Sequence, residues 1–320
     1  MNGWALALHR DGRVEPVDPQ VACGHRHGAA FLWVHLDGRE SETRAWLQHH
    51  AALPEAAITA LTATETRPRS EAIGRGALVN LRGLGAPDAT GGDPLVSIRL
   101  WAEEGRVISV AFRTIDGFDL LRHEMEQGEV RDPGDLISAL AVLITAKLDP
   151  RVADLGDLID ECEANLDTAT LFDQRRRIAA ARSEAIGYRR FVMPQREALE
   201  RIAALDVHWL EENDRLHLRE AADRCARMAE ELEAVRERTA LLHEQLTDLR
   251  AEQIETRTLV LSIVALVFLP LTFLTGLLGM NVDGIPFAHE PWAFAGVVAL
   301  CALVATAITA YFVRAHWFSR

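Results

Sequence analysis

The sequence lacks an excess of basic residues. Its 320 residues include 34 Lys and Arg against 47 Asp and Glu, so the formal net charge is −13 at pH 7. A protein that binds nucleic acid needs a basic surface to meet the phosphates, so this balance excludes nucleic acid as an expected partner. An acidic chain can attract cations, although many soluble proteins are equally acidic.

Cysteine is scarce, and its positions are scattered. No Cys-x-x-Cys pair occurs among the four residues, which are Cys23, Cys162, Cys225 and Cys301. This spacing argues against a disulfide framework and against a structural zinc site made of cysteines. We therefore expect most of the chain to lie in the reducing cytosol. The N-terminal residues include no basic segment followed by a long apolar stretch, so we expect no cleavable signal peptide.

Signatures of catalysis are missing as well. The sequence contains no Gly-x-Gly-x-x-Gly loop, no Gly-x-x-x-x-Gly-Lys-[Ser/Thr] loop and no His-Glu-x-x-His motif. We predict a protein that is not an enzyme and has neither catalytic residues nor a resident cofactor. One local set of metal-binding side chain types does occur, in Cys23-Gly-His-Arg-His27. It is interpreted either as a small metal site or as an ordinary loop.

The first third of the chain indicates short strands mixed with helices. Apolar runs of strand length occur at Phe31–Leu36 and Ala77–Leu81. Asp11-Gly12 and Glu103–Gly105 each separate two such runs and favour hairpin turns. A short helix is expected at Glu55–Leu61. Together these features predict an α+β domain with a mixed or antiparallel sheet.

From Asp132 onward the pattern becomes helical. Asp132 is a suitable N-cap before Pro133, and the apolar run Leu136–Leu148 is too short to cross a bilayer, so it predicts a buried core helix. Between Gln195 and Arg257 there is no Pro and no Gly, and apolar residues recur every three or four positions. This pattern predicts one very long helix or a helical hairpin packed in a bundle. We assign residues 1–190 to a cytoplasmic α/β domain and residues 191–257 to a long stalk helix.

Two long uncharged stretches end the chain. Residues 258–282 and 291–313 contain no Asp, Glu, Lys or Arg, and each exceeds the roughly 20 residues that cross a bilayer as a helix. We predict a membrane hairpin at 258–320, with a first span at about 258–280, an outer loop at 281–291, a second span at about 292–313 and a tail at 314–320. Arginines flank the ends of the hairpin, whereas its loop carries only acidic charge. The positive-inside rule therefore places both termini in the cytoplasm and the connecting loop outside. We expect the hairpin to lie in the cell's inner membrane.

A pore would need several copies of the chain, because two helices cannot enclose a hydrophilic path. The first span is the better candidate to line it, since it carries small and hydroxyl residues. Counting back from Asn281 in helical steps gives one face, consisting of Thr258, Leu261, Ala265, Leu269, Thr272 and Gly276. Rings of aliphatic side chains can gate by dewetting, and hydroxyl groups can hold hydrated ions. Ordinary helix packing through Thr and Gly is the alternative interpretation of this face.

The first span ends in Gly279-Met280-Asn281, preceded by Leu-Pro-Leu-Thr-Phe-Leu-Thr-Gly. This tripeptide at the outer end of the penultimate span, followed by one more span and a short basic tail, resembles the CorA superfamily of divalent metal ion transporters. Ile285-Pro286 after the tripeptide and Met193–Leu199 in the helical region are similar to the zinc-transporting ZntB branch. The resemblance in architecture covers the whole chain, whereas these motifs lie between about residues 190 and 290.

The resemblance implies a fold and a function. It implies a homopentamer with a funnel-shaped cytoplasmic domain, in which Gly279, Met280 and Asn281 form the outer mouth of a pore that transports Zn²⁺, with possible coupling to protons. Amide oxygens at the mouth would contact the water shell of the ion, which avoids the cost of dehydration. Asp283 departs from the pattern of the branch. It would form either a ring of carboxylates at the entrance or a set of solvated loop residues.

Two alternatives remain open. The same architecture can carry Mg²⁺, Co²⁺ or Ni²⁺, and zinc prefers imidazole and thiolate ligands that the proposed pore face does not contain. A membrane-anchored sensor or scaffold is an alternative of another class, but it leaves the Gly-Met-Asn mouth unexplained. The expected partners are further copies of the chain, membrane lipid and the transported metal ion.

Overall fold

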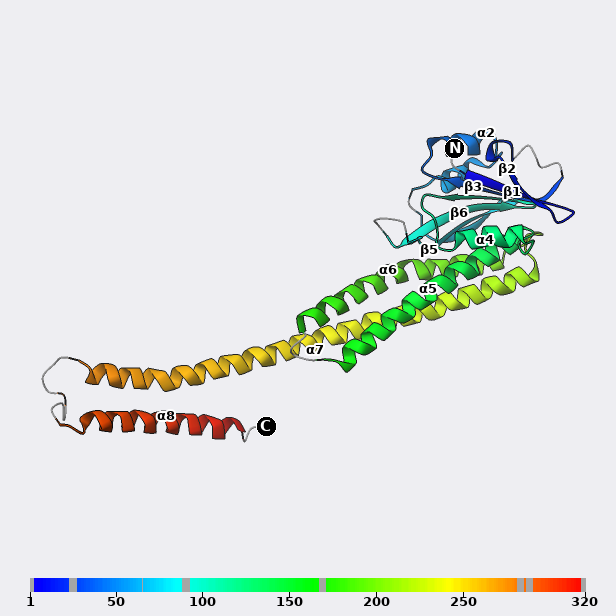
Figure 1. Cartoon of the computed structure of the whole chain (residues 1–320). Helices are drawn as coiled ribbons and strands as arrows, with labels where there is room; N and C mark the ends of the chain where they lie inside the picture. The colour runs from blue at the N-terminus through cyan, green and yellow to red at the C-terminus, as the bar shows by residue number, and fades with distance from the viewer. Residues whose placement is uncertain are drawn as a thin grey trace. The chain divides into compact units, whose positions relative to one another are not determined.

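The computed structural model describes residues 3–22, 28–64, 66–87, 93–166, 171–280, 285 and 290–317. The chain forms two compact units, shown in Figure 1. The first comprises Met1–Leu166 and Phe172–His243, and the second comprises Asp167–Leu171 and Glu244–Arg320. Each unit is considered by itself below.

A mixed sheet forms the centre of the first unit. The described residues give it seven strands in the order β2-β1-β3-β7-β6-β5-β4. These are β1 (Gly3–His9), β2 (Val14–Val17), β3 (Ala29–Asp37), β4 (Arg69–Ile73), β5 (Gly76–Leu84), β6 (Leu95–Glu103) and β7 (Arg106–Ala111). β3 pairs with β7 in parallel, and the remaining neighbours pair antiparallel. The predicted α+β class with a mixed sheet is confirmed.

Both predicted hairpin turns are confirmed. β1 pairs with β2 across Asp11-Gly12, and β6 pairs with β7 across Glu104-Gly105. Gly12 and Gly105 have φ angles of 84° and 71°, a backbone region that glycine enters without steric cost.

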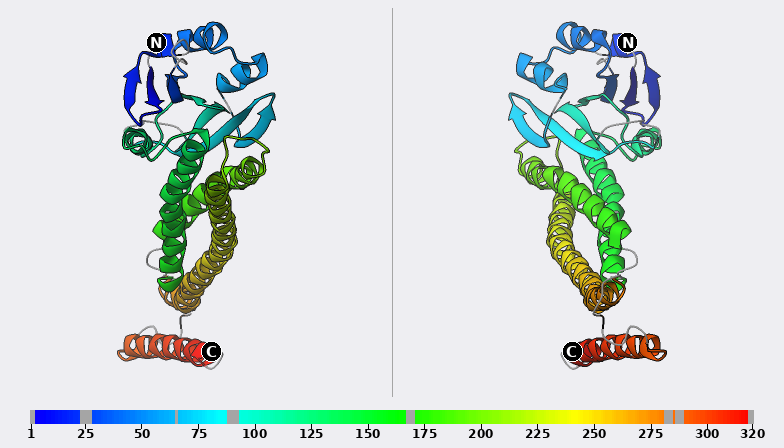
Figure 2. Two further views of the ribbon diagram at one scale, coloured as in Figure 1. Left: turned by 90° about the vertical axis from the view of Figure 1, so that its right-hand side faces the viewer. Right: turned by 90° about the vertical axis from the view of Figure 1, so that its left-hand side faces the viewer.

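Helices cover both faces of this sheet (Figure 2). α2 (Ser41–His49) and α3 (Glu55–Leu61) pack on one face, where Leu32 and Val34 belong to their core cluster. Side chains alternate along a strand, so Trp33 faces the other side, where its ring lies 5.5 Å from that of Phe118. Phe118 is the first residue of α4 (Phe118–Glu126), and α5 packs on the same face of the sheet. A short α1 (Pro19–Ala22) contacts β1 and β3.

The long helices α5 (Pro133–Ala164) and α6 (Leu171–Ala203), with the part of α7 (Glu212–Leu278) up to His243, complete the first unit. The predicted N-cap is confirmed, because the Asp132 carboxylate accepts a hydrogen bond from the Asp135 N–H at 2.9 Å. Ion pairs join the helices: Arg238 on α7 reaches Glu163 on α5, and Arg189 on α6 lies 3.0 Å from Glu233 on α7.

The long helix begins later than predicted. A stalk helix was expected at 191–257, but residues up to Ala203 belong to α6, and α7 starts only at Glu212. The helical-hairpin alternative is therefore the correct one. Side chains, rather than a Pro or a Gly, fix the break between the two helices. The Asp214 carboxylate accepts the Glu211 N–H at 2.9 Å, and Arg215 donates to the Ala203 carbonyl at 2.6 Å. The domain boundaries drawn from the sequence stay a prediction, although position 190 lies inside α6.

The second unit contains the end of α7 together with α8 (Ala293–Trp317). Within the described residues, these are the two helices that are long and apolar enough to cross a membrane. α7 continues without interruption through Arg257 to Leu278. The two C-terminal apolar helices predicted from the sequence are confirmed.

Candidate functional site

The candidate ion path lies along the uncharged end of α7. Side chains that are partly covered recur every three or four residues there, which places them on one face of the helix. They are Leu259, Ile263, Val267, Pro270, Leu271, Leu274 and Leu278. A matching stripe on α8 consists of Ala293, Val297, Cys301, Val304, Ala305 and Ile308. The two helices lie side by side in the second unit (Figure 1), and Pro270 of the first stripe and Ile308 of the second border the same groove.

The predicted pore face is exposed along its whole length. All six of its residues, Thr258, Leu261, Ala265, Leu269, Thr272 and Gly276, are exposed in the single chain. At 3.6 residues per turn, this face lies about half a turn from the partly covered stripe. Leu269 and Thr272 also border an open groove of about 870 Å³ that reaches Ile308 on α8. The face predicted to line a pore is thus exposed in the single chain, and Leu269 and Thr272 lie at its edge toward the groove.

This segment offers oxygen acceptors without charge. The Thr272 hydroxyl donates to the Phe268 carbonyl at 2.8 Å, and the Ser262 hydroxyl donates to the Thr258 carbonyl at 2.9 Å. Each hydroxyl keeps lone pairs for a further hydrogen bond. Pro270 has no N–H, so it cannot donate to the Leu266 carbonyl. Such oxygens can accept hydrogen bonds from the waters around a dication, since those waters point their protons outward.

The predicted mouth is described only in part. The Gly279 N–H donates to the Thr275 carbonyl at 2.9 Å, and a Cβ at position 279 would lie 2.9 Å from the same oxygen. A larger residue would therefore disturb the end of the helix. Met280 is 47% exposed. Asn281 and Asp283 lie outside the described residues, as does the Cys23–His27 cluster, and their roles stay predictions.

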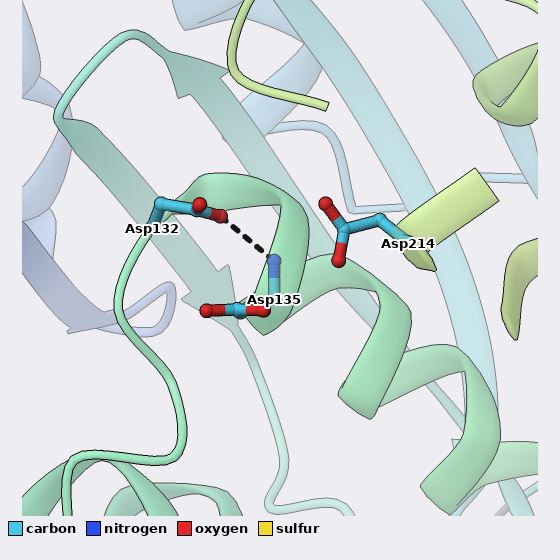
Figure 3. A group of neighbouring side chains, drawn as sticks. All are labelled: Asp132, Asp135 and Asp214. Carbon is cyan, nitrogen blue, oxygen red and sulfur yellow. Dashed lines mark hydrogen bonds between the residues drawn. The ribbon is translucent and has the colours of Figure 1, made fainter. Parts of the chain in front are cut away.

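A group of three carboxylates lies in the first unit, as Figure 3 shows. Asp132 and Asp135 flank the start of α5, and Asp214 belongs to the first turn of α7. Each contributes one oxygen to a set in which all the oxygens lie within 4.8 Å of one another. Asp214 also lies 3.4 Å from the Ser138 hydroxyl. This arrangement can hold a metal ion, and three carboxylates suit a hard cation such as Mg²⁺ better than Zn²⁺.

Burial and mutual repulsion shift the acidity of this group. Burial raises the pKa of Asp132 to about 6; the charges of Asp135 and Asp214 add to the shift, and the hydrogen bond from the Asp135 N–H opposes it. Burial likewise raises the pKa of Asp214. From the sequence, Asp132 is identifiable only as an N-cap. The cluster is not apparent there, because Asp214 comes from a distant helix and no sequence spacing connects the two.

Comparisons with known proteins agree with this architecture. The family model described as "CorA-like Mg2+ transporter protein" matches residues 28–314. The zinc transport protein ZntB of Pectobacterium atrosepticum is 31% identical over 314 residues, which cover 98% of this chain and 95% of that protein. The full-length CmaX protein has a TM-score of 0.76 at 30% identity and covers 99% of this chain and 98% of its own. The CorA magnesium transporter from Methanocaldococcus jannaschii has a TM-score of 0.78 at 15% identity over 98% of both chains, which is a likeness of fold alone.

Proposed function

We propose that this chain, which belongs to the CorA-like Mg²⁺ transporter protein family, transports Zn²⁺ across the inner membrane through a homopentameric pore lined by the end of α7. Family membership supports the transport of a divalent metal ion as the general activity. The observation that carries the proposal of a pore is the continuous face of α7, from Thr258 to Gly276, that is exposed in the single chain.

The choice of Zn²⁺ has two supports. The relative from Pectobacterium atrosepticum is named a zinc transport protein and is similar over nearly the full length of both chains. The residues around Gly279-Met280-Asn281 also resemble the zinc-transporting branch. A transported ion that keeps its water shell needs hydrogen-bond acceptors rather than direct thiolate or imidazole ligands. The absence of His and Cys from residues 258–280 is therefore compatible with zinc as cargo.

The mechanism follows from the chemistry of the exposed face. In a pentamer, five copies of Leu261, Ala265 and Leu269 would form apolar rings that exclude water when the pore is narrow and gate it by dewetting. Hydroxyl and amide oxygens at Thr272 and Asn281 would accept hydrogen bonds from the waters of the ion. Both termini face the cytoplasm in this arrangement, because the basic residues flank the hairpin and are absent from its loop. Residues 258–280 contain no Asp, Glu or His, so any coupling to protons would use groups outside this span.

Zinc flux into proteoliposomes tests the proposal. We expect the intact protein to take up Zn²⁺ faster than Mg²⁺ and the Asn281→Ala variant to lose most of this flux. The matched control is Thr306→Ala on α8, whose hydroxyl donates to the Ala302 carbonyl and which lies off the proposed path. This control should retain its flux. Imposing a pH gradient then measures whether zinc movement is coupled to protons.

The alternatives give different results in the same assay. Magnesium, cobalt or nickel flux without zinc flux would assign the chain to a different cargo within the same fold. Folded, oligomeric protein that moves no divalent ion would favour a membrane-anchored sensor. Equal loss of flux in Asn281→Ala and Thr306→Ala would remove the support for a mouth at Asn281.

A further inference from the structure

A cavity of about 530 Å³ in the first unit has a basic lining. It lies between the segment that follows α3, the strands β5 and β6, and helix α6. The lining includes three arginines, a threonine, an aromatic ring and one aspartate, which are Arg67, Arg82, Arg190, Thr66, Phe191 and Asp93. Within the described part of the chain, Asp93 is the one carboxylate among the lining residues. Such a concentration of arginine is unexpected in a chain with a net charge of −13.

A further arginine lies buried behind this lining. Arg99 on β6 is 2% exposed, and its guanidinium donates to the backbone carbonyls of Ser97 at 3.4 Å and Thr64 at 3.2 Å. Its Nε has no hydrogen-bond partner among the described residues, and no described carboxylate pairs with it. Burial lowers the pKa of Arg99 to about 10, and the nearby charge of Arg82 adds to this effect. A buried charge without a counterion is costly, so Arg99 makes this part of the domain a favourable place for an anion.

Arg82 is held rigidly at the cavity wall. Its Nη2 donates to Asp93 Oδ2 at 3.0 Å and to the Leu95 carbonyl at 2.8 Å, and its guanidinium lies 3.8 Å above the centre of the Phe191 ring. Burial lowers the pKa of Arg82, and the charges of Arg190 and Arg113 add to the shift against the opposing effect of Asp93. The Nε of Arg82 has no partner among the described residues, and neither does the buried hydroxyl of Thr66. Polar groups that remain unpaired in a buried site favour a ligand that can satisfy them.

We propose that this cavity binds a multivalent oxyanion, of the class of small phosphate-bearing molecules. Guanidinium groups match phosphate oxygens through paired, charge-assisted hydrogen bonds, and the Thr66 hydroxyl supplies another donor. A single negative charge would offset only part of the repulsion among the arginines, whereas a polyanion offsets most of it. The volume lies within the roughly 300–1,000 Å³ that small-molecule sites occupy. The site belongs to the first unit and is independent of the proposed transport path.

Direct binding of inorganic pyrophosphate to the full-length protein in detergent tests this site. Isothermal titration calorimetry at low ionic strength, with a chelator present to remove divalent ions, should show one pyrophosphate bound per chain. The variant carries Arg67→Gln and Arg190→Gln together, because both side chains are exposed and their replacement leaves the core intact. We expect its affinity to fall on the order of ten-fold or more. The matched control is Arg182→Gln, an exposed arginine two turns earlier on α6 that lies outside the cavity lining, and it should bind as tightly as the wild type.

Three results would overturn the proposal. The first is wild-type protein that binds no pyrophosphate at millimolar concentration. The second is unchanged affinity in the Arg67→Gln, Arg190→Gln variant. The third is an equal loss of affinity in Arg182→Gln, which would assign the binding to general surface charge. Because the readout is binding rather than flux, failure of this proposal is distinguishable from failure of the proposed transport function.

Discussion

Asp132 has two opposite effects on stability at the start of α5. Its carboxylate caps the helix by accepting the Asp135 N–H, yet it is half-buried and faces the carboxylates of Asp135 and Asp214. The folded protein therefore holds a proton on Asp132 more tightly than the unfolded chain does, with a pKa of about 6 against 3.8. For a carboxylate with a raised pKa, the stabilising contribution is fully present below pH 3.8 and is lost as the pH rises through about 6.

The Asp132→Asn substitution should therefore stabilise the protein at neutral pH. Asparagine caps a helix as well as aspartate does, and it removes the buried charge. We expect the free energy of unfolding at pH 7.5, with a chelator present, to rise by about 1 kcal/mol after allowance for solvent screening. The gain should shrink steadily as the pH is lowered to 4.5. Denaturant unfolding followed by tryptophan fluorescence measures this, with the exposed Asp154→Asn as control. A loss of stability at pH 7.5 would contradict the interpretation.

Replacing glycine by alanine should have opposite effects on stability at two positions of the first unit. A Cβ at Gly134 would lie 2.2 Å from an Asp214 carboxylate oxygen and 2.8 Å from the Trp209 carbonyl, whereas a Cβ at Gly187 would meet nothing within 4 Å. Gly134→Ala should therefore destabilise the protein by about 1–3 kcal/mol through overpacking. Gly187→Ala, in the interior of α6, should stabilise it by up to about 1 kcal/mol through helix propensity. The same unfolding assay compares the two, and changes of the same sign would refute the packing argument.

At the scale of elements, the end of α7 divides into two faces. The side chains of one face are partly covered, and the other, exposed face carries the residues predicted to line a pore. The division follows from helical periodicity, because side chains three or four positions apart share a face. We therefore expect a residue's position around the helix, rather than its hydrophobicity, to decide how a substitution there affects the proposed transport.

A bulky residue on the proposed pore face should block ion flux. We expect Ala265→Trp to reduce metal flux on the order of ten-fold or more, because five indole rings would fill the path. The control is Ala299→Trp, an exposed alanine of α8 outside its partly covered stripe, and it should change flux by no more than about two-fold. Proteoliposome uptake with protein amounts matched by blotting provides the comparison. Equal inhibition by both substitutions would argue against α7 as the lining helix.

At the scale of the whole molecule, one chain is insufficient for the proposed function. Its two membrane helices cannot surround a path, and many large apolar side chains near the end of α7, such as Leu261, Leu269 and Phe273, remain more than 60% exposed in the single chain. In a membrane, lipid would cover some of these residues, and a small residue such as Gly276 on the same helix allows a neighbouring helix to approach closely.

Protein extracted in mild detergent should therefore be an oligomer. Native mass spectrometry should give five times the mass of the 35.4-kDa chain, as the proposed pentamer requires. Zinc flux should be found in the oligomeric fraction and not in any monomeric one. Transport by a purified monomer would contradict the proposed pore, and another closed ring size would revise only the number of subunits.

Elements with a local cause were predictable from the order of residues alone. Uncharged stretches of sufficient length predicted the two apolar helices, Asp-Gly and Glu-Gly turns predicted two hairpins, and Asp132 before Pro133 predicted the start of α5. The pore face of α7 also follows from periodicity alone, although its role stays a prediction. The Gly-Met-Asn motif gave the family, which the comparisons confirm.

Features that depend on contacts between distant segments could be found only in the folded protein. The break between α6 and α7 contains no Pro or Gly. Asp214 and Arg215 fix it through hydrogen bonds that form only in the folded chain. The carboxylate cluster joins α5 to α7, and the basic cavity joins a loop, two strands and α6. Burial also raises the pKa of Asp132, and the buried Arg99 has no carboxylate partner among the described residues. Such features are invisible in a linear sequence, since desolvation and long-range Coulomb interactions arise only when the chain brings these groups together out of water.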